Sequence, residues 1–278
     1  MITLKRYIGQ WGNQLCQAAV CKILADRTGL PWVPPSGWLT KSGKPLRWTG
    51  EPIVEVEGTP GVHKKGRYHH LHFDHWCDLS QFGPKCGEIT ITHCYAQRYE
   101  MLQPYRDLIR NCWLRIRVPF LDTDPEAVYC HVRRTDYVPG VDNPNDPSRH
   151  CLAATLDDYR ECLAEFPDAK RLLVATDDPA DPFIENMRTL GLPLEVLGGA
   201  WDTDWLALAS ARWLIMPQST YSWWAGFLGR AERIVCPIRT GTHWWFGRII
   251  RGPAAIGHDY PNLYVYDEPH RWIWKELP

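Results

Sequence analysis

The chain has 278 residues, 45% of them hydrophobic and 23% charged, which is typical of a soluble globular protein. Its formal net charge of −1 argues against a nucleic-acid partner, because nucleic-acid-binding proteins carry a basic surplus. No apolar run approaches the ~20 residues that a transmembrane segment needs, and the N-terminus shows no secretory signal. We therefore expect a cytoplasmic protein.

The first half opens with a strand, a glycine-containing turn and a helix that Gly29 would end. Residues 31–100 are rich in Pro, Gly and His and give a weaker pattern. The elements expected in this half are a strand at residues 2–8, a turn at 9–12, a helix at 13–28, a short strand at 88–94 and a helix at 102–114.

The second half alternates strands and helices regularly. Such alternation predicts a parallel sheet with helices on both faces, as in a Rossmann-like domain. We expect domains at 1–122 and 123–278, with the boundary near Pro119–Pro125, and the extreme C-terminus could pack back on the first domain. The strands are expected at residues 127–132, 171–176, 193–197, 212–216 and 233–236, and the helices near 155–165, 181–190, 203–211 and 220–229.

Charged residues directly follow the apolar strand expected at residues 127–132; they are Arg133, Arg134 and Asp136. In open α/β folds, ligands bind at the carboxyl ends of the strands. This placement therefore predicts an anion site. An exposed turn with a surface salt bridge remains the alternative.

Two further strands also end in polar side chains. Asp177 and Asp178 follow residues 171–176, where a carboxylate could bind guanine or a ribose hydroxyl, or could cap the next helix. Ser219 and Thr220 stand at the start of the helix expected at 220–229. Such a helix start is a natural phosphate site, although either hydroxyl could simply be a cap.

Metal sites are the less favoured alternatives. Two Asp-Thr-Asp triplets, at residues 122–124 and 202–204, resemble metal-binding triplets but are also explained by capping. The segment from His69 to His75 contains four histidines and Asp74, yet it also fits a half-buried strand with one polar face. The ten cysteines are scattered without a Cys-x-x-Cys pair, which indicates reduced thiols rather than zinc ligands.

Three segments in register resemble one enzyme family. GQWGNQLCQAA, HVRRTDY and QSTYSWWAGFL are similar to motifs of the α-1,2-fucosyltransferases, glycosyltransferase family 11, and of their wider GDP-fucose-dependent relatives. ATDDP and CYAQRYEMLQPYRDLIR resemble further family segments less closely. Thr135 replaces a family glycine, as in the α-1,6-fucosyltransferases, and Gln218 replaces an asparagine.

The resemblance implies a GT-B fold, in which two Rossmann-like domains face a cleft. It implies an inverting, metal-independent transfer of L-fucose from GDP-fucose to a hydroxyl of a glycan acceptor, in α-1,2 linkage. GDP-fucose would be a substrate, and no cofactor is expected. The first domain would lie on the acceptor side, and the segment from His69 to His75 is expected to be a loop of this domain that could contact the acceptor. The protein could then be peripheral to a membrane that carries the acceptor. Another linkage, another GDP-sugar, or a non-catalytic sugar- or nucleotide-binding protein remain the alternatives.

The resemblance also implies roles for particular residues. Arg133 would contact the β-phosphate and stabilise the charge that develops on GDP. The general base would lie on or after the arginine loop, where Asp136, Asp142, Asp146 and His150 are candidates and Asp142 is favoured. The implied donor-binding residues are Gly12, Asn13, His131, Arg133, Asp177, Ser219, Thr220 and Ser222.

Overall fold

The computed structural model describes residues 1–34, 47–48, 51–52, 54–56, 58–62, 65–135, 153–198, 200–239 and 263–277. They divide into two compact units, the first made by residues up to Val118 with Leu263, and the second by residues 119–239 and 264–277. Each unit is built on a parallel sheet, which confirms the predicted α/β class. The division falls beside the boundary expected near Pro119–Pro125.

The sheet of the first unit has three parallel strands in the order β1-β6-β5. They are β1 (Ile2–Leu4), β6 (Cys86–His93) and β5 (Arg67–His72). The strand expected at residues 2–8 is wrong beyond Leu4. There the backbone of Ile8 pairs instead with the amide of Gln17, whose Nε2 donates to Ile8 O at 2.8 Å and whose Oε1 accepts from Ile8 N at 3.0 Å.

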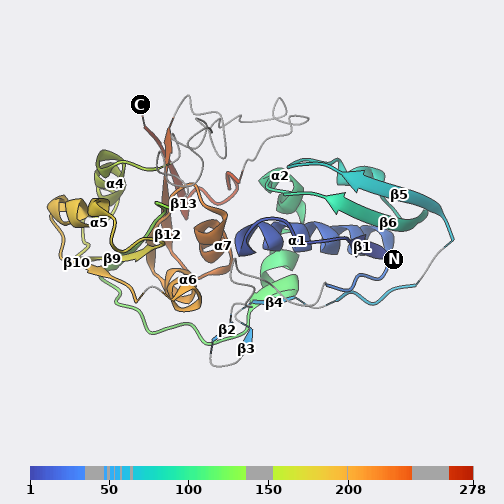
Figure 1. Ribbon diagram of the computed structural model, residues 1–278, viewed down its shortest axis with the longest axis horizontal. Helices are drawn as coiled ribbons and strands as arrows, with labels where there is room; N and C mark the ends of the chain where they lie inside the picture. The colour runs from blue at the N-terminus through green and yellow to red at the C-terminus, as the bar shows by residue number, and fades with distance from the viewer. Residues whose placement is uncertain are drawn as a thin grey trace. The chain divides into compact units, whose positions relative to one another are not determined.

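Helix α1 (Trp11–Thr28) follows this turn and lies beside β1 (Figure 1). It starts two residues before the predicted position and ends, as predicted, at Gly29 in the left-handed conformation, φ 64°. Nearly all of its residues are buried. A helix that is buried on all sides forms the centre of its unit rather than covering one face.

The helix expected at residues 102–114 is broken into short helical pieces. Pro104 stands at the start of the second piece, where it supplies no backbone N–H for a continuous α-helix. The smaller elements of this unit are β2 (Arg47–Trp48), β3 (Glu51–Pro52), β4 (Val54–Val56), η1 (Leu79–Gln81), α2 (Tyr99–Leu102), η2 (Gln103–Tyr105), α3 (Arg106–Leu108), η3 (Ile109–Trp113) and β7 (Leu114–Ile116).

The sheet of the second unit has six parallel strands in the order β10-β9-β8-β11-β12-β13. This is the order of the doubly wound dinucleotide-binding fold, whose direction of winding reverses beside its first strand. Five of these strands were predicted. The strands are β8 (Ala127–Val132), β9 (Arg171–Thr176), β10 (Leu194–Val196), β11 (Trp213–Ile215), β12 (Arg233–Arg239) and β13 (Trp272–Leu277).

The sixth strand, β13, was missed. It pairs with β12 from Trp272 to Leu277, so residues 272–277 belong to the second unit. Arg271 holds it in place with a buried guanidinium. This group donates to the backbone carbonyls of Gly226, Gly229 and Ala231 at 2.5, 2.8 and 2.6 Å.

Helices cover both faces of this sheet (Figure 1). Alternate side chains of β8 lie on opposite faces of the sheet. On one face, Val128, Cys130 and Val132 join the buried cluster that contains Tyr159 of α4 and Ile184 of α5. The opposite face meets the other two helices. The helical elements are α4 (Leu156–Leu163), α5 (Pro182–Met187), η5 (Arg188–Leu190), α6 (Trp201–Ser210) and α7 (Thr220–Leu228), which confirms the predicted helices to within a few residues.

Nine cysteines lie in the part of the chain that the structure describes, and all nine are free thiols. Most are buried in the two cores, where burial raises the pKa of Cys130 and Cys236 well above the ordinary thiol value. They therefore act as small hydrophobic residues, as predicted. None of the helices among the described residues is long and apolar enough to span a membrane.

Candidate functional site

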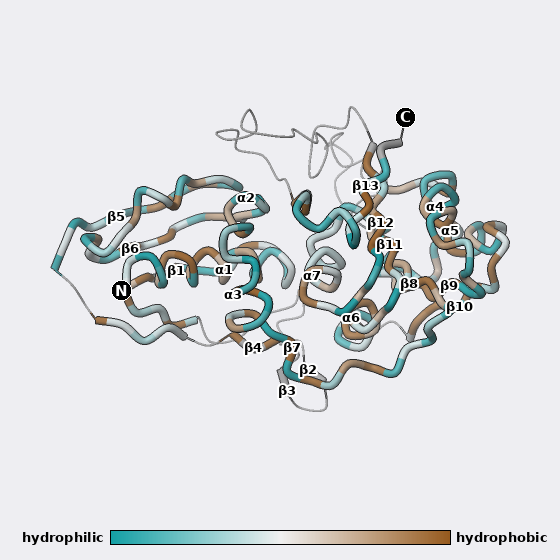
Figure 2. Tube along the Cα trace, turned by 180° about the vertical axis from the view of Figure 1, so that it is seen from behind, coloured by the Kyte–Doolittle hydropathy of each residue, from teal (hydrophilic) through white to brown (hydrophobic). Residues whose placement is uncertain are grey.

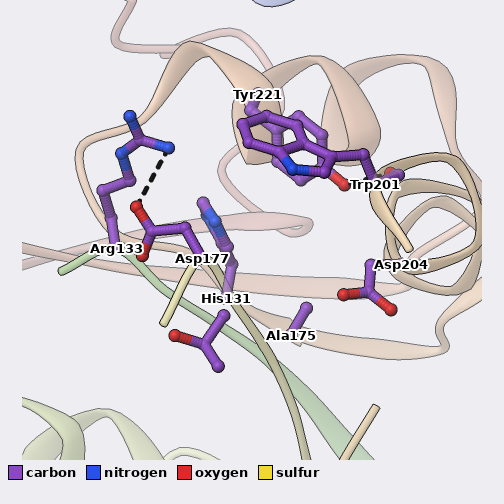
Figure 3. A pocket seen from close by; sticks show the side chains of 8 residues that line it. His131, Arg133, Ala175, Asp177, Trp201, Asp204 and Tyr221 are labelled. Atoms are coloured by element: carbon purple, nitrogen blue, oxygen red, sulfur yellow. Dashed lines mark hydrogen bonds and ion pairs between the residues drawn. The ribbon is translucent and has the colours of Figure 1, made fainter. Parts of the chain in front are cut away.

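A small pocket opens at the carboxyl edge of the second sheet (Figure 3). It lies where β8, the first strand of this sheet, meets its neighbours β9 and β11. The winding of the fold reverses beside β8, and such a point is where open α/β sheets bind ligands. The lining residues are His131, Arg133, Ala175, Thr176, Asp177, Trp201, Asp204 and Tyr221.

Side chains from β8 and β9 meet in the pocket because, on each strand, they lie two residues apart. His131 and Arg133 are two residues apart at the end of β8, and Ala175 and Asp177 are two apart at the end of β9. Side chains two residues apart share one face of a strand. Since His131 pairs in register with Ala175, the next position on that face brings Arg133 to Asp177.

Arg133 and Asp177 form an ion pair in this pocket. Nη1 of Arg133 lies 3.1 Å from Oδ2 of Asp177, and the two side chains are 9% and 6% exposed. The same carboxylate accepts hydrogen bonds from Arg134 N at 2.8 Å and Thr135 Oγ1 at 2.5 Å. Asp177 therefore shapes the arginine loop, and the hydroxyl of Thr135 helps to hold it.

The second arginine of the loop points elsewhere. Nε of Arg134 lies 2.9 Å from Oδ2 of Asp181, and its guanidinium stacks 4.4 Å from the centroid of the Phe183 ring. Asp181 also caps α5 by accepting from Phe183 N at 2.8 Å. Arg134 is thus a structural residue that fastens the loop to α5, while Arg133 faces the pocket.

His131 is a buried, neutral histidine. Burial lowers its pKa to about 3, and the positive charge of Arg133 adds to this effect. Its Nδ1 has no hydrogen-bond partner among the described residues. A buried polar atom without a partner costs free energy, so Nδ1 is suited to a hydrogen bond with a ligand in the pocket.

The far wall of the pocket was not predicted as a site. It consists of Trp201 and Asp204 from α6 and Tyr221 from α7. Trp201 is 39% exposed, and its ring meets that of Tyr221 at 5.5 Å in an edge-to-face arrangement. Figure 3 shows the Asp204 carboxylate on the opposite side of the pocket from Arg133.

Asp204 belongs to the second Asp-Thr-Asp triplet, for which capping was one explanation. The N-cap of α6 is Ala200, and Asp204 lies within the first turn, only 5% exposed. The sequence signal that could have identified Asp204 is its place directly before the apolar run at residues 205–209, which is buried in α6. A charged residue is rarely placed there without a structural or functional reason.

The start of α7 is also at this edge, because β11 precedes it and pairs with β8. Ser219 is the N-cap residue, and its side chain makes no capping hydrogen bond. Ser222 lies in the first turn and donates to Ser219 O at 3.3 Å, while its neighbour Tyr221 lines the pocket. The first N–H groups of the helix have no intrahelical partner and favour an anion.

The other sites considered from sequence are explained structurally. In the first Asp-Thr-Asp triplet, Asp124 accepts from Glu126 N at 2.9 Å and pairs with Arg171. Residues of the histidine segment up to His72 form part of strand β5 rather than the expected loop, and Leu71 is the buried side chain of this strand. Within the described ranges, no group of three His, Cys, Asp or Glu side chains is placed to hold a metal ion.

Several other predicted site residues stay predictions. Asp136, Asp142, Asp146 and His150 lie outside the described residues, so Asp142 stays a prediction. Gly12 and Asn13 lie in the first unit, at the start of α1, where Asn13 Oδ1 accepts from Gln97 Nε2 at 2.6 Å. Their contact with a donor also stays a prediction.

The sequence matches no protein-family model and no curated protein. Among solved structures, a crystal structure of POFUT1 in complex with GDP matches, with 13% sequence identity and a TM-score of 0.40. The match covers 84% of this chain and 96% of that chain. A TM-score this low does not establish corresponding residues, so the site rests on its own geometry.

Proposed function

We propose that this chain is a GDP-sugar-dependent glycosyltransferase of the GT-B type, and specifically an inverting, metal-independent fucosyltransferase. It would transfer L-fucose from GDP-fucose to a hydroxyl of a glycan acceptor in α-1,2 linkage. The donor would bind at the pocket of the second unit. The three sequence segments that resemble the fucosyltransferases support the choice of donor, and one of them, HVRRTDY, contributes His131 and Arg133 to this pocket.

One observation carries the proposal: a nearly buried arginine faces a pocket at the carboxyl edge of a doubly wound sheet, beside a helix start. Breaking the sugar–phosphate bond leaves negative charge on the β-phosphate. A guanidinium remains charged at all physiological pH values and can hold two phosphate oxygens at once. Arg133 and the N-terminus of α7 would stabilise the departing GDP together.

The opposite side of the pocket suits a nucleobase. Guanine presents its N1–H and exocyclic amino group as two adjacent donors, and a carboxylate can accept both. Asp177 was expected to take this role, but its oxygens bind the arginine loop. Asp204 is therefore our candidate for the base, with Trp201 offering a ring face and His131 Nδ1 a hydrogen bond to the nucleoside.

Calorimetric titration with GDP and GDP-fucose in EDTA tests the donor site. Wild-type protein should bind both, and Arg133→Ala should lower the affinity by about 100-fold, in line with the loss of a strong electrostatic contact. Arg160→Ala is the matched control, because this arginine is half-exposed on α4 of the same unit.

Absence of GDP binding by the wild type, or binding that appears only with a divalent cation, would refute the proposed donor site. Release of GDP from GDP-fucose should then be followed with a panel of glycans. Tight donor binding without turnover on any of them would favour the alternative of a non-catalytic nucleotide-sugar-binding protein.

A further inference from the structure

A second group of polar side chains gathers in the first unit, where β5 and β6 end. We name it the ring cluster; its members are His72, Asp74, His75, His93 and Tyr95. The rings of His72 and His93 stack at 4.9 Å with an interplanar angle of 22°, and those of His75 and Tyr95 stack at 5.4 Å. Tyr95 meets His93 edge to face at 5.5 Å, which joins the two stacks.

The backbone around the ring cluster is firmly held. Phe73 N donates to His93 O at 3.1 Å, and the carbonyl of Asp74 accepts from both Tyr95 N and Ala96 N at 2.6 and 2.8 Å. Ala96 has a φ of 56°, in the left-handed region that residues other than glycine seldom adopt. Such local strain persists where the surroundings fix it, and it concentrates at functional sites.

The ring cluster combines ring faces with an exposed acceptor. Nε2 of His93 lies 2.7 Å from Oδ1 of Asp74, and these side chains are 24% and 57% exposed. The neighbouring strand β5 is among the hydrophilic stretches of Figure 2, so these rings do not belong to the hydrophobic core of the first unit. The members include no arginine or lysine, which a phosphate-bearing ligand would require.

These features match the chemistry of a neutral saccharide. A pyranose presents C–H groups on one face, which pack on flat rings, and hydroxyls at its edge, which donate to carboxylates and imidazoles. The position fits as well, because β1, β6 and β5 are parallel and ligands bind at the carboxyl ends of such strands.

We propose that the ring cluster binds the acceptor saccharide, with a neutral hexose on the His72, His93 and Tyr95 rings and its hydroxyls on the Asp74–His93 pair. This inference rests on the proposed function and names the acceptor subsite for it. It assigns this role to particular side chains of the first unit, where the segment from His69 to His75 was expected only to form a loop that could contact the acceptor.

The full chain, saturated with GDP, is applied to a printed array of neutral and acidic oligosaccharides. Wild-type protein should bind neutral glycans, and His93→Gln and Tyr95→Ala should each weaken binding by about tenfold, the loss of one or two hydrogen bonds or ring contacts. His70→Ala is the matched control, since His70 lies on the same strand outside the ring cluster and packs on Tyr68. The affinity for GDP should not change in any variant.

Unchanged glycan binding in His93→Gln and Tyr95→Ala would overturn the acceptor subsite, and so would binding restricted to acidic glycans or to none. His72 is exposed, so His72→Ala should leave the fold intact. This variant should weaken glycan binding as the other two do, which shows that their effect does not come from unfolding. Calorimetry with GDP separates the two proposals. A wild type that binds GDP but no neutral glycan refutes the subsite alone, whereas failure to bind GDP refutes the donor site.

Discussion

Asp177 Oδ2 lies 3.1 Å from Arg133 Nη1, in a pair almost closed to solvent, and this carboxylate also fixes the loop that carries the arginine. Asp177→Asn should therefore lower the free energy of unfolding by about 3 kcal/mol, because it leaves a buried guanidinium without its counter-charge. It should also weaken GDP binding. Urea unfolding and calorimetry measure the two effects. Asp178→Asn, which changes a turn residue, is the control; equal behaviour of both variants would contradict the positioning role of Asp177.

Asp204→Asn tests base recognition. If Asp204 accepts hydrogen bonds from both N1–H and the amino group, the wild type should prefer GDP to inosine diphosphate, which lacks the amino group. We expect a preference of about tenfold or more, the value of a hydrogen bond to a charged group. The variant should lose this preference. Asp202→Asn, in the same helical turn, should keep it, and a wild type that binds both nucleotides equally would exclude this role.

The neutral state of His131 predicts acid sensitivity. Its pKa is about 3 in the folded protein and near 6.5 in the unfolded chain, so the unfolded chain binds the extra proton between these values. Stability from this residue is complete above about pH 6.5 and is lost as the pH falls towards 3, at up to about 1.4 kcal/mol per pH unit. Unfolding of wild type and His131→Asn between pH 7.5 and 5.5 should show a steeper loss in the wild type. Parallel curves would contradict a buried neutral imidazole.

Arg271→Met should be among the most destabilising changes in the second unit. The guanidinium satisfies three backbone carbonyls and pairs with Glu268 at 3.4 Å, all out of solvent. We expect a loss of about 3–5 kcal/mol. Arg212→Met, which breaks the exposed pair with Glu232, should cost less than about 1 kcal/mol. Thermal or urea unfolding distinguishes the two, and similar losses would contradict this account of Arg271.

Gly9→Ala should disturb the turn before α1. Gly9 has a φ of 73°, and a Cβ there would meet the side chain of Asn13, which would have to move. The left-handed conformation alone costs about 1–2 kcal/mol for alanine, and the clash adds to it. Gly83→Ala meets nothing within 4 Å and is the control. A Gly9→Ala protein as stable as wild type would show that this turn can rearrange.

The second unit was predictable because its signals are local. Strands β8, β9, β10 and β11 are short apolar runs, and the next described element after each is a helix. The periodicity of the apolar residues and the order of the segments therefore predicted nearly every element. Strand β13 escaped because Trp272 to Leu277 reads as a polar-aromatic segment whose partner, β12, lies more than thirty residues earlier.

The pocket was only half predictable for a related reason. The residues at the end of a strand can be located once the strand itself is predicted. The positions of His131, Arg133 and Asp177 in the sequence were therefore enough to identify them. Asp204 and Trp201 reach the pocket through helix packing, which depends on how α6 lies over β8 and β9. The ion pair between Arg133 and Asp177 depends on the register between β8 and β9, and no sequence pattern reports it.

The position of β13 has a consequence for how the protein is made. Residues 272–277 form an edge strand, and Arg271 secures the end of α7, yet the ribosome delivers them after every other strand of that sheet. Until they emerge, β12 presents an unpaired edge to the cell, which invites association with other chains. The nascent chain should therefore depend on chaperones until residues 272–277 have emerged from the ribosome.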